Sequence, residues 1–270
     1  MNYALTDAKR ILMHSILQKS CCLEVSMNML AVSLGFIPFI VLLSFSIHWR
    51  SLKTVSSSSA RLEYSRVPYL GYSFLLVMVS WVLFIASPAK EFPSLLIPLG
   101  SIFAIIGDYF NLQHEFAQRI TRNTPIFGGL LSFSITQICY SAAFCAFSSN
   151  SSLFNFTYSI PLIVLFVSIP QIVFSLRVYY KGMPARIVWG SRVYSCLLGF
   201  MAAAALIYAF AYGGFWILIA CGGVLYLISD SILGETTVHG RHPRAEYQLP
   251  WITYLAAQGC IIIGYGLLSP

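Results

Sequence analysis

The sequence predicts an all-α, polytopic membrane protein, a bundle of about eight transmembrane helices. Of its 270 residues, 58% are hydrophobic and only 9% are charged, whereas a soluble domain carries about a quarter charged residues. So few charges cannot cover a water-facing surface, and the bilayer is therefore the expected solvent. The formal net charge of +7 comes from residues between apolar stretches, a pattern that favours contacts with membrane lipids and not with nucleic acid.

Eight apolar stretches are close to the ~20 residues that a helix needs to cross a hydrocarbon core of about 30 Å. Aromatic residues such as Trp49 and Tyr69 stand at many of their ends, as is typical of the headgroup level. Together they form a predicted transmembrane domain, residues 29–270. The predicted spans are Met29–Trp49, Tyr69–Ala86, Phe92–Phe110, Phe127–Phe147, Ser159–Val178, Val193–Tyr212, Phe215–Leu233 and Leu249–Leu268.

The N-terminal segment, residues 1–28, has no uninterrupted apolar core because Asp7, Lys9 and Lys19 divide it. This pattern excludes a secretory signal peptide. The segment predicts either a short amphipathic helix on the membrane surface or a disordered tail.

Basic residues concentrate in the connections after the odd-numbered spans, and the even-numbered connections hold only Lys90. The positive-inside rule then places the odd connections in the cytoplasm. Sequons at Asn150 and Asn155 favour the endoplasmic reticulum membrane if the protein is eukaryotic, and a bacterial protein would occupy the inner membrane. The basic residues of the odd connections are Arg50, Lys53, Arg61 and Arg66; Arg119 and Arg122; Arg177, Lys181, Arg186 and Arg192; and Arg241 and Arg244.

Two acidic residues, Asp108 and Asp230, lie inside apolar runs. A carboxylate in hydrocarbon costs about 2.5 kcal/mol or more, so such a residue normally faces the bundle interior and has a function. The alternative is a carboxyl at the water boundary, satisfied by headgroups and helix ends. Both residues stand near the end of an odd-numbered span, and both are therefore expected on the cytoplasmic side.

The surroundings of the two aspartates are similar. A small residue precedes each, and a glutamine, Gln137 or Gln258, follows each at nearly the same spacing in the next span. This similarity suggests a parallel repeat of spans one to four and five to eight, related by an axis along the membrane normal. Such a repeat would bring the two carboxyls toward a shared cavity.

Five short motifs resemble those of the YhhN family of integral membrane lysoplasmalogenases, and they keep the family's order from about residue 90 to the end. Gln137 stands where the family pattern has histidine, and Lys53 is followed by Thr where the pattern has a Lys-Pro pair. The matching motifs are Gly107-Asp108; Gly129-Leu130 with Phe133 and Tyr140; Tyr194 with Met201 and Ala205; Ser229-Asp230-Ser231-Ile232-Leu233; and Tyr254 with Ala257-Gln258.

The resemblance implies hydrolysis of the sn-1 vinyl ether of a lysoplasmalogen, a lysophospholipid, with Asp108 and Asp230 as the catalytic pair. One carboxyl would be protonated and the other ionised, and no metal or other cofactor is expected. Other predicted site residues bind or orient the substrate, or alternatively form ordinary interhelical hydrogen bonds. These residues are Gln137, Tyr140, Tyr194, Tyr254 and Gln258.

Two competing functions remain open from the residues alone. A transporter or lipid-binding protein could use the aspartate pair for proton coupling. A metal-dependent lipid hydrolase would need several ligands inside the spans, where His48 is the only candidate histidine. A serine nucleophile is not supported, because the sequence contains no Gly-x-Ser-x-Gly turn.

Overall fold

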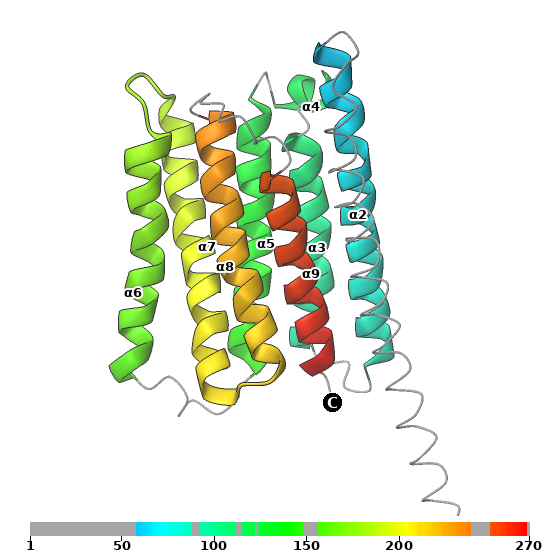
Figure 1. Ribbon diagram of the computed structural model, residues 1–270, viewed down its shortest axis with the longest axis vertical. Coiled ribbons are helices and arrows are strands. Elements are labelled where there is room, and N and C mark those ends of the chain that lie inside the picture. The colour runs from blue at the N-terminus through cyan, green and yellow to red at the C-terminus, as the bar shows by residue number, and fades with distance from the viewer. Residues whose placement is uncertain are drawn as a thin grey trace, which may run out of the picture.

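The computed structural model describes residues 58–87, 92–111, 115–121, 124–147, 156–238 and 249–268, in which every regular element is helical (Figure 1). Seven of the described segments are long and apolar enough to cross a membrane. Predicted spans two to eight are thereby confirmed, while predicted span Met29–Trp49 and segment 1–28 lie outside the described residues. The elements are α2 (Ser58–Ala86), α3 (Phe92–Asn111), α4 (Glu115–Ile120), α5 (Pro125–Phe147), α6 (Phe156–Val173), η2 (Phe174–Val178), α7 (Ala185–Tyr212), α8 (Phe215–Leu233), η3 (Gly234–Val238) and α9 (Leu249–Leu268).

Two helices begin earlier than their apolar spans. Helix α7 begins at Ala185, directly after Pro184, so that Arg186 and Arg192 are helical and not part of a connecting loop. Hydropathy detects only the part of a helix that lies in hydrocarbon, and the helix continues through polar residues at the headgroup level. Proline before the first helical residue is a common helix start.

Helix α2 shows the same difference. It begins at Ser58, and its first turns include Arg61 and Arg66, which the sequence places in a loop. A short helix, α4, also forms between α3 and α5 in a connection without an apolar signal.

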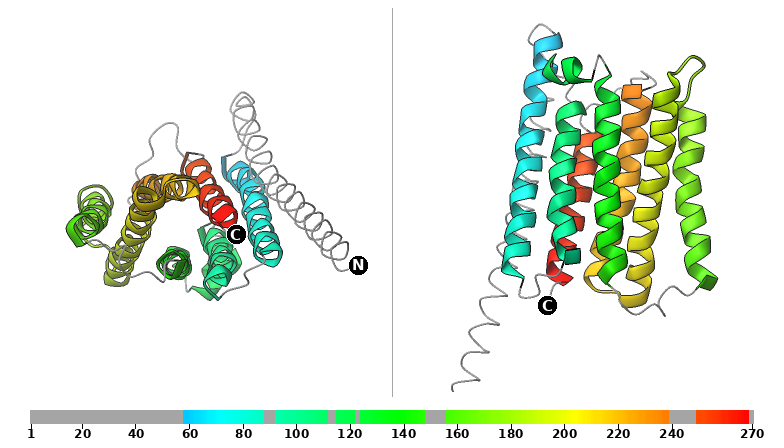
Figure 2. Two further views of the ribbon diagram at one scale, coloured as in Figure 1. Left: turned by 90° about the horizontal axis from the view of Figure 1, so that it is seen from below. Right: turned by 180° about the vertical axis from the view of Figure 1, so that it is seen from behind.

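Six helices form a closed ring, in which each packs on the next in the order α2, α3, α5, α7, α8, α9 and back to α2. Seen along the bundle axis, this ring surrounds the core, and α6 lies outside it against α7 (Figure 2). Large apolar side chains of α6 are exposed, including Leu165 and Ile172. In a membrane protein such a face contacts lipid.

The order of helices around the ring agrees with the predicted repeat. Helices α3 and α5 pack together as α8 and α9 do, and α2 packs on α3 as α7 packs on α8. The two halves then close on each other through α5 against α7 and α9 against α2. Each of these contacts in one half therefore has a counterpart in the other.

Individual contacts repeat in the same register. A Cβ at Gly100 would lie 3.1 Å from the Cβ of Cys139, and a Cβ at Gly222 would lie 3.1 Å from the Cβ of Cys260. Both glycines let two helices approach closely, as small residues do in membrane bundles. The two cysteines occupy equivalent positions on α5 and α9.

A second close approach lies at a similar level in both halves. The Ser80 and Ser101 hydroxyls are 2.9 Å apart between α2 and α3. On α8, Gly223 is the counterpart of Ser101, and its Cβ would lie 3.0 Å from the Cα of Ala202, one residue beyond the counterpart of Ser80 on α7. The parallel repeat is thus visible in the packing, although the side chains at equivalent positions often differ.

One end of the bundle carries the described basic connections, and we call it the basic end. It comprises the last turns of α3 and α8 and the first turns of α5, α7 and α9 (top of Figure 1). Arg119 on α4, Arg177 on η2 and Arg186 on α7 lie there. Asp108 and Asp230 stand in the last turns of α3 and α8, at the same end.

Candidate functional site

Asp108 is buried, with 1% of its surface exposed, and one carboxyl oxygen accepts two hydrogen bonds. The Ser73 hydroxyl of α2 donates at 2.6 Å, and the Tyr254 hydroxyl of α9 donates at 3.0 Å. Gly107 permits this burial because the Phe133 ring lies only 2.8 Å from where a Cβ would stand. The Gly-Asp pair thus fixes one carboxyl among four helices.

Asp230 on α8 is only partly buried, and one of its carboxyl oxygens accepts a hydrogen bond from the Tyr194 hydroxyl of α7. Its neighbour Ser229 is buried and donates to the Pro250 carbonyl at 2.8 Å. That bond ties the end of α8 to the start of α9. The serine-aspartate pair therefore sets both the position of the carboxyl and the packing of the helix that carries Tyr254.

A cavity of about 270 Å³ joins the two carboxyls, because Asp108 and Asp230 both line it. Asn111 and Phe133 form part of its wall, and Trp251 closes it from α9. The predicted pair is thus brought to one cavity at the basic end of the bundle. The carboxyls come from equivalent helices of the two repeats.

A larger cavity, about 740 Å³ including the space at its mouth, adjoins Asp230. It shares Asn111, Phe133, Asp230 and Leu233 with the smaller cavity. Elsewhere its lining is mostly apolar, with a few hydroxyl groups such as Ser191 and Ser195. The apolar lining comes from Ile126, Leu130, Pro170, Val173, Phe174, Val178, Leu198 and Leu227.

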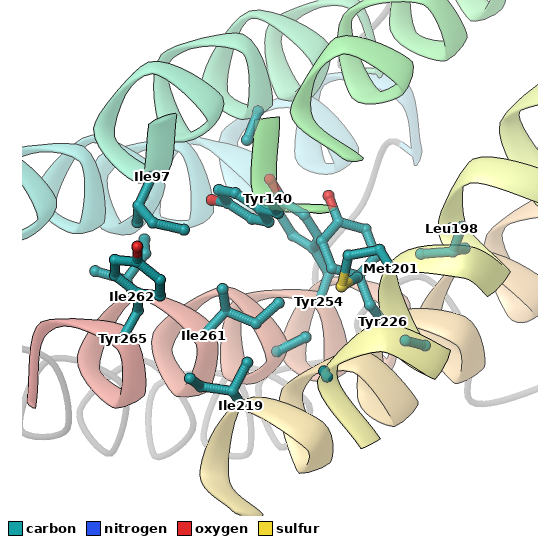
Figure 3. Close-up of a cluster of buried hydrophobic side chains, with 14 of the residues drawn as sticks. Ile97, Tyr140, Leu198, Met201, Ile219, Tyr226, Tyr254, Ile261, Ile262 and Tyr265 are labelled. Atoms are coloured by element: carbon teal, nitrogen blue, oxygen red, sulfur yellow. The ribbon is translucent and has the colours of Figure 1, made fainter. Parts of the chain in front are cut away.

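A second set of polar groups lies deeper in the core, close to the aspartates. The Tyr140 hydroxyl donates to Gln258 at 2.6 Å, and the Gln258 amide donates to the Tyr226 hydroxyl at 3.2 Å. The Tyr226 ring packs edge-on against Tyr254 at 5.4 Å, and Figure 3 shows these tyrosines together with Met201. This set joins α5, α8 and α9 beneath Asp108.

Gln137 is fully buried, and neither polar atom of its amide has a hydrogen-bond partner of standard geometry. The Tyr194 hydroxyl lies close to this amide. A buried polar group without a partner is rare in native proteins and usually marks a functional position or a bound molecule. Gln137 is therefore the predicted orienting residue whose side chain makes no hydrogen bond of standard geometry.

Four of the seven predicted site residues, Asp108, Tyr194, Asp230 and Tyr254, line the two cavities, whereas Gln137, Tyr140 and Gln258 line neither. The sequence analysis did not name Asn111, which lines both cavities, or the bonded residues Ser73 and Tyr226. Ser73 carried a signal in the sequence, because it precedes Asp108 by almost the same spacing as Tyr194 precedes Asp230. Tyr226 stands one helical turn before Asp230, on the same face of α8. The repeat register and the helical period would have found Ser73 and Tyr226.

The arrangement can move protons. Two carboxyls share one cavity, hydroxyl donors fix the orientation of each, and one borders a space shaped for an apolar chain. Among the described residues, no group of three His, Cys, Asp or Glu side chains is placed to hold a metal ion. The fold and this site define a polytopic membrane protein with a paired-carboxyl centre at one end of its bundle.

The comparison with protein-family models gives the particular family. The YhhN family model matches residues 29–265, which is most of the chain, and the protein belongs to the YhhN family. Searches of curated proteins and of solved structures returned no match.

Proposed function

We propose that this protein is a lysoplasmalogenase, which hydrolyses the sn-1 vinyl ether of a lysoplasmalogen to a fatty aldehyde and a glycerophospho alcohol. The observation that carries the proposal is the pair of aspartates on one cavity, with a larger apolar cavity beside Asp230. Membership of the YhhN family supports the same function. The apolar cavity suits the alkenyl chain, and the carboxyls suit acid–base chemistry.

The reaction needs one carboxylic acid and one carboxylate. The acid protonates the vinyl carbon farther from the ether oxygen, and an oxocarbenium ion forms at the carbon next to that oxygen. Water adds to this carbon while the carboxylate accepts a water proton. The resulting hemiacetal then collapses. Its hydroxyl proton passes to the aspartate that began as the acid, and the aspartate that began as the carboxylate protonates the departing glycerol oxygen. Both carboxyls end in their starting states.

The geometry suggests which aspartate plays which part. Asp108 accepts hydrogen bonds from both Ser73 and Tyr254 on one oxygen, an arrangement that suits an ionised acceptor. Asp230 borders the larger apolar cavity, where the alkenyl carbon would lie. Asp230 is therefore assigned as the acid and Asp108 as the base that activates water.

The test is aldehyde release from lysoplasmenylethanolamine by the purified full-length protein. We expect release from the vinyl ether and none from its saturated-ether analogue, with Asp108→Asn and Asp230→Asn each lowering kcat by at least about 100-fold, as expected for loss of an acid–base group. Ser134→Ala is the matched control, because it removes a hydroxyl bonded within its own helix. A folded wild-type protein that releases no aldehyde would overturn the proposal.

A further inference from the structure

The rim of the larger cavity is built by two π-helical turns. Segments η2 and η3 continue α6 and α8 at the basic end, and they pack against each other. A Cβ at Gly234 would lie 3.0 Å from a methyl group of Val178, and both residues line the cavity. Short π-helical turns occur frequently at functional sites.

This rim carries charges of opposite sign. The Arg177 guanidinium lies 3.5 Å from the Glu235 carboxylate, and the two side chains are 62% and 26% exposed. An exposed ion pair adds little stability, because water competes for both partners. The contribution of this pair to the stability of the fold is therefore small.

A neighbouring cation, Arg192, is held differently. Its guanidinium stands 5.2 Å above the Phe174 ring and donates to Gln171 at 3.3 Å and to Ser175 at 3.5 Å. These contacts fix Arg192 against α6 and support Phe174, which lines the cavity. Among the described residues of η2 and η3, Arg177 is the one cation, and its side chain is largely exposed beside the residues that line the cavity.

The rim stands at a suitable height above the carboxyl. Glu235 follows Asp230 by little more than one helical turn, which is about 7 Å along the axis at 1.5 Å per residue. In a lysophospholipid, five bonds separate the ether oxygen from phosphorus, which is about 6 Å for an extended chain with ordinary bond lengths. A substrate with its ether oxygen at Asp230 would place its phosphate at the rim.

We propose that Arg177 and Glu235 form the subsite for a zwitterionic phospholipid headgroup. The Arg177 guanidinium binds the phosphate, to which its planar donors are suited. The Glu235 carboxylate binds the ammonium group of ethanolamine or choline. This inference rests on the proposed function, and it goes further by naming the headgroup class and the residues that select it.

The test measures binding of saturated 1-O-alkyl ligands, which the proposed chemistry leaves intact, to the full-length protein in nanodiscs. Three ligands share one chain: an ethanolamine lysophospholipid, the corresponding phosphate monoester and the alkylglycerol without phosphate. Arg177→Gln should weaken both phosphate ligands by about 5- to 20-fold, the range of one charge-assisted bond, and leave the alkylglycerol unchanged. Glu235→Gln should weaken the ethanolamine ligand and strengthen the phosphate monoester.

Lys181→Gln is the control, because it makes the same charge change at an exposed residue in the turn after η2, outside both rim segments. We expect it to change none of the three affinities. Equal changes for all ligands in either rim variant, or no change in any, would overturn the headgroup subsite. The expected ligand pattern without aldehyde release would uphold the subsite and sink only the vinyl ether hydrolysis.

Discussion

The two halves of the repeat place their carboxyls on equivalent helices but surround them differently. In the first half, Asp108 is buried and accepts bonds from Ser73 and Tyr254. In the second half, Asp230 is partly exposed and accepts one described side-chain bond, from Tyr194, whose position on α7 corresponds to that of Ser73 on α2. One half of the molecule is closed around its carboxyl, and the other is open to a cavity.

The repeat register explains why Asp230 has one described hydroxyl donor fewer than Asp108. By the repeat register, the residue equivalent to Tyr254 is Phe133, which has a ring in the same place but no hydroxyl. Phe133 lines both cavities, and its ring packs against Tyr194 and Tyr254. On the side of Asp230 that corresponds to the Tyr254 side of Asp108, the ring therefore offers no hydroxyl donor.

The glutamines show the same difference. Gln258 is held by Tyr140 and Tyr226, whereas Gln137 has no partner of standard geometry. The residues equivalent to those tyrosines are Ile261 and Ala104, and neither has a side-chain polar atom. The comparison teaches that Asp108 lies in a bonded polar frame to which both halves contribute, whereas the equivalent positions around Asp230 carry apolar side chains.

The largest expected effect is a difference in the free energy of unfolding between variants of Gln258 and Gln137. Gln258→Leu leaves the buried Tyr140 and Tyr226 hydroxyls without that amide and should lower the free energy of unfolding by about 1–3 kcal/mol. Gln137→Leu removes an amide with no hydrogen bond of standard geometry and the Tyr194 hydroxyl as its close polar neighbour, so its free energy of unfolding should stay the same or rise. Thermal unfolding in a fixed detergent measures both. Equal losses in the two variants would show that Gln137 is bonded as firmly as Gln258.

The next effect tests the surroundings of Asp230, which Phe133 reaches from α5. Phe133→Tyr would place a hydroxyl into the cavity beside Asp230 and make the two halves more alike. We expect kcat/KM for lysoplasmenylethanolamine to fall by about tenfold, equivalent to 1.4 kcal/mol, with little change in thermal stability. Unchanged kcat/KM would mean that the empty side of Asp230 has no part in the reaction. Phe127→Tyr, at a more exposed position on the same helix, is the control.

The smallest effect lies in the closed half. Ser73→Ala removes one of two donors to Asp108, and Tyr254 remains in place. Because a single hydrogen bond to a carboxylate contributes about 1.5–3 kcal/mol at most, and Tyr254 offsets part of the loss, we expect kcat to fall only a few-fold. Ser80→Ala, in the same helix and at the same interface, should leave kcat unchanged. A loss as large as that of Asp108→Asn would make Ser73 essential.

Much of the fold followed from composition and hydropathy. The ends of α8 and α9 were predicted to the residue, since an apolar run ends where the hydrocarbon ends. The early starts of α2 and α7 could not be predicted in this way, because a helix in the headgroup layer is polar and has no period set by burial. The π-helical turns η2 and η3 also have no signal in an apolar pattern.

Site residues could be predicted where a charged side chain lies in an apolar run, because burying a charge in hydrocarbon is costly. Uncharged polar site residues gave no such signal. Asp108 and Asp230 were found because a carboxyl within an apolar run demands a reason. Ser73 was missed because serine is tolerated in membrane helices and satisfies itself on its own backbone. Which basic residue lies beside the cavity rim depends on how α6 and α8 end, and the choice of Arg177 therefore needed the packing of η2 on η3.

Both carboxyls stand in the last turns of α3 and α8, at the basic end of the bundle. The proposed reaction would yield two products that prefer opposite phases. The aldehyde would dissolve in the bilayer, and the charged alcohol would leave into water past the rim. Solvent partition would then clear the site after each turnover and pull the reaction forward, without any large motion of the bundle.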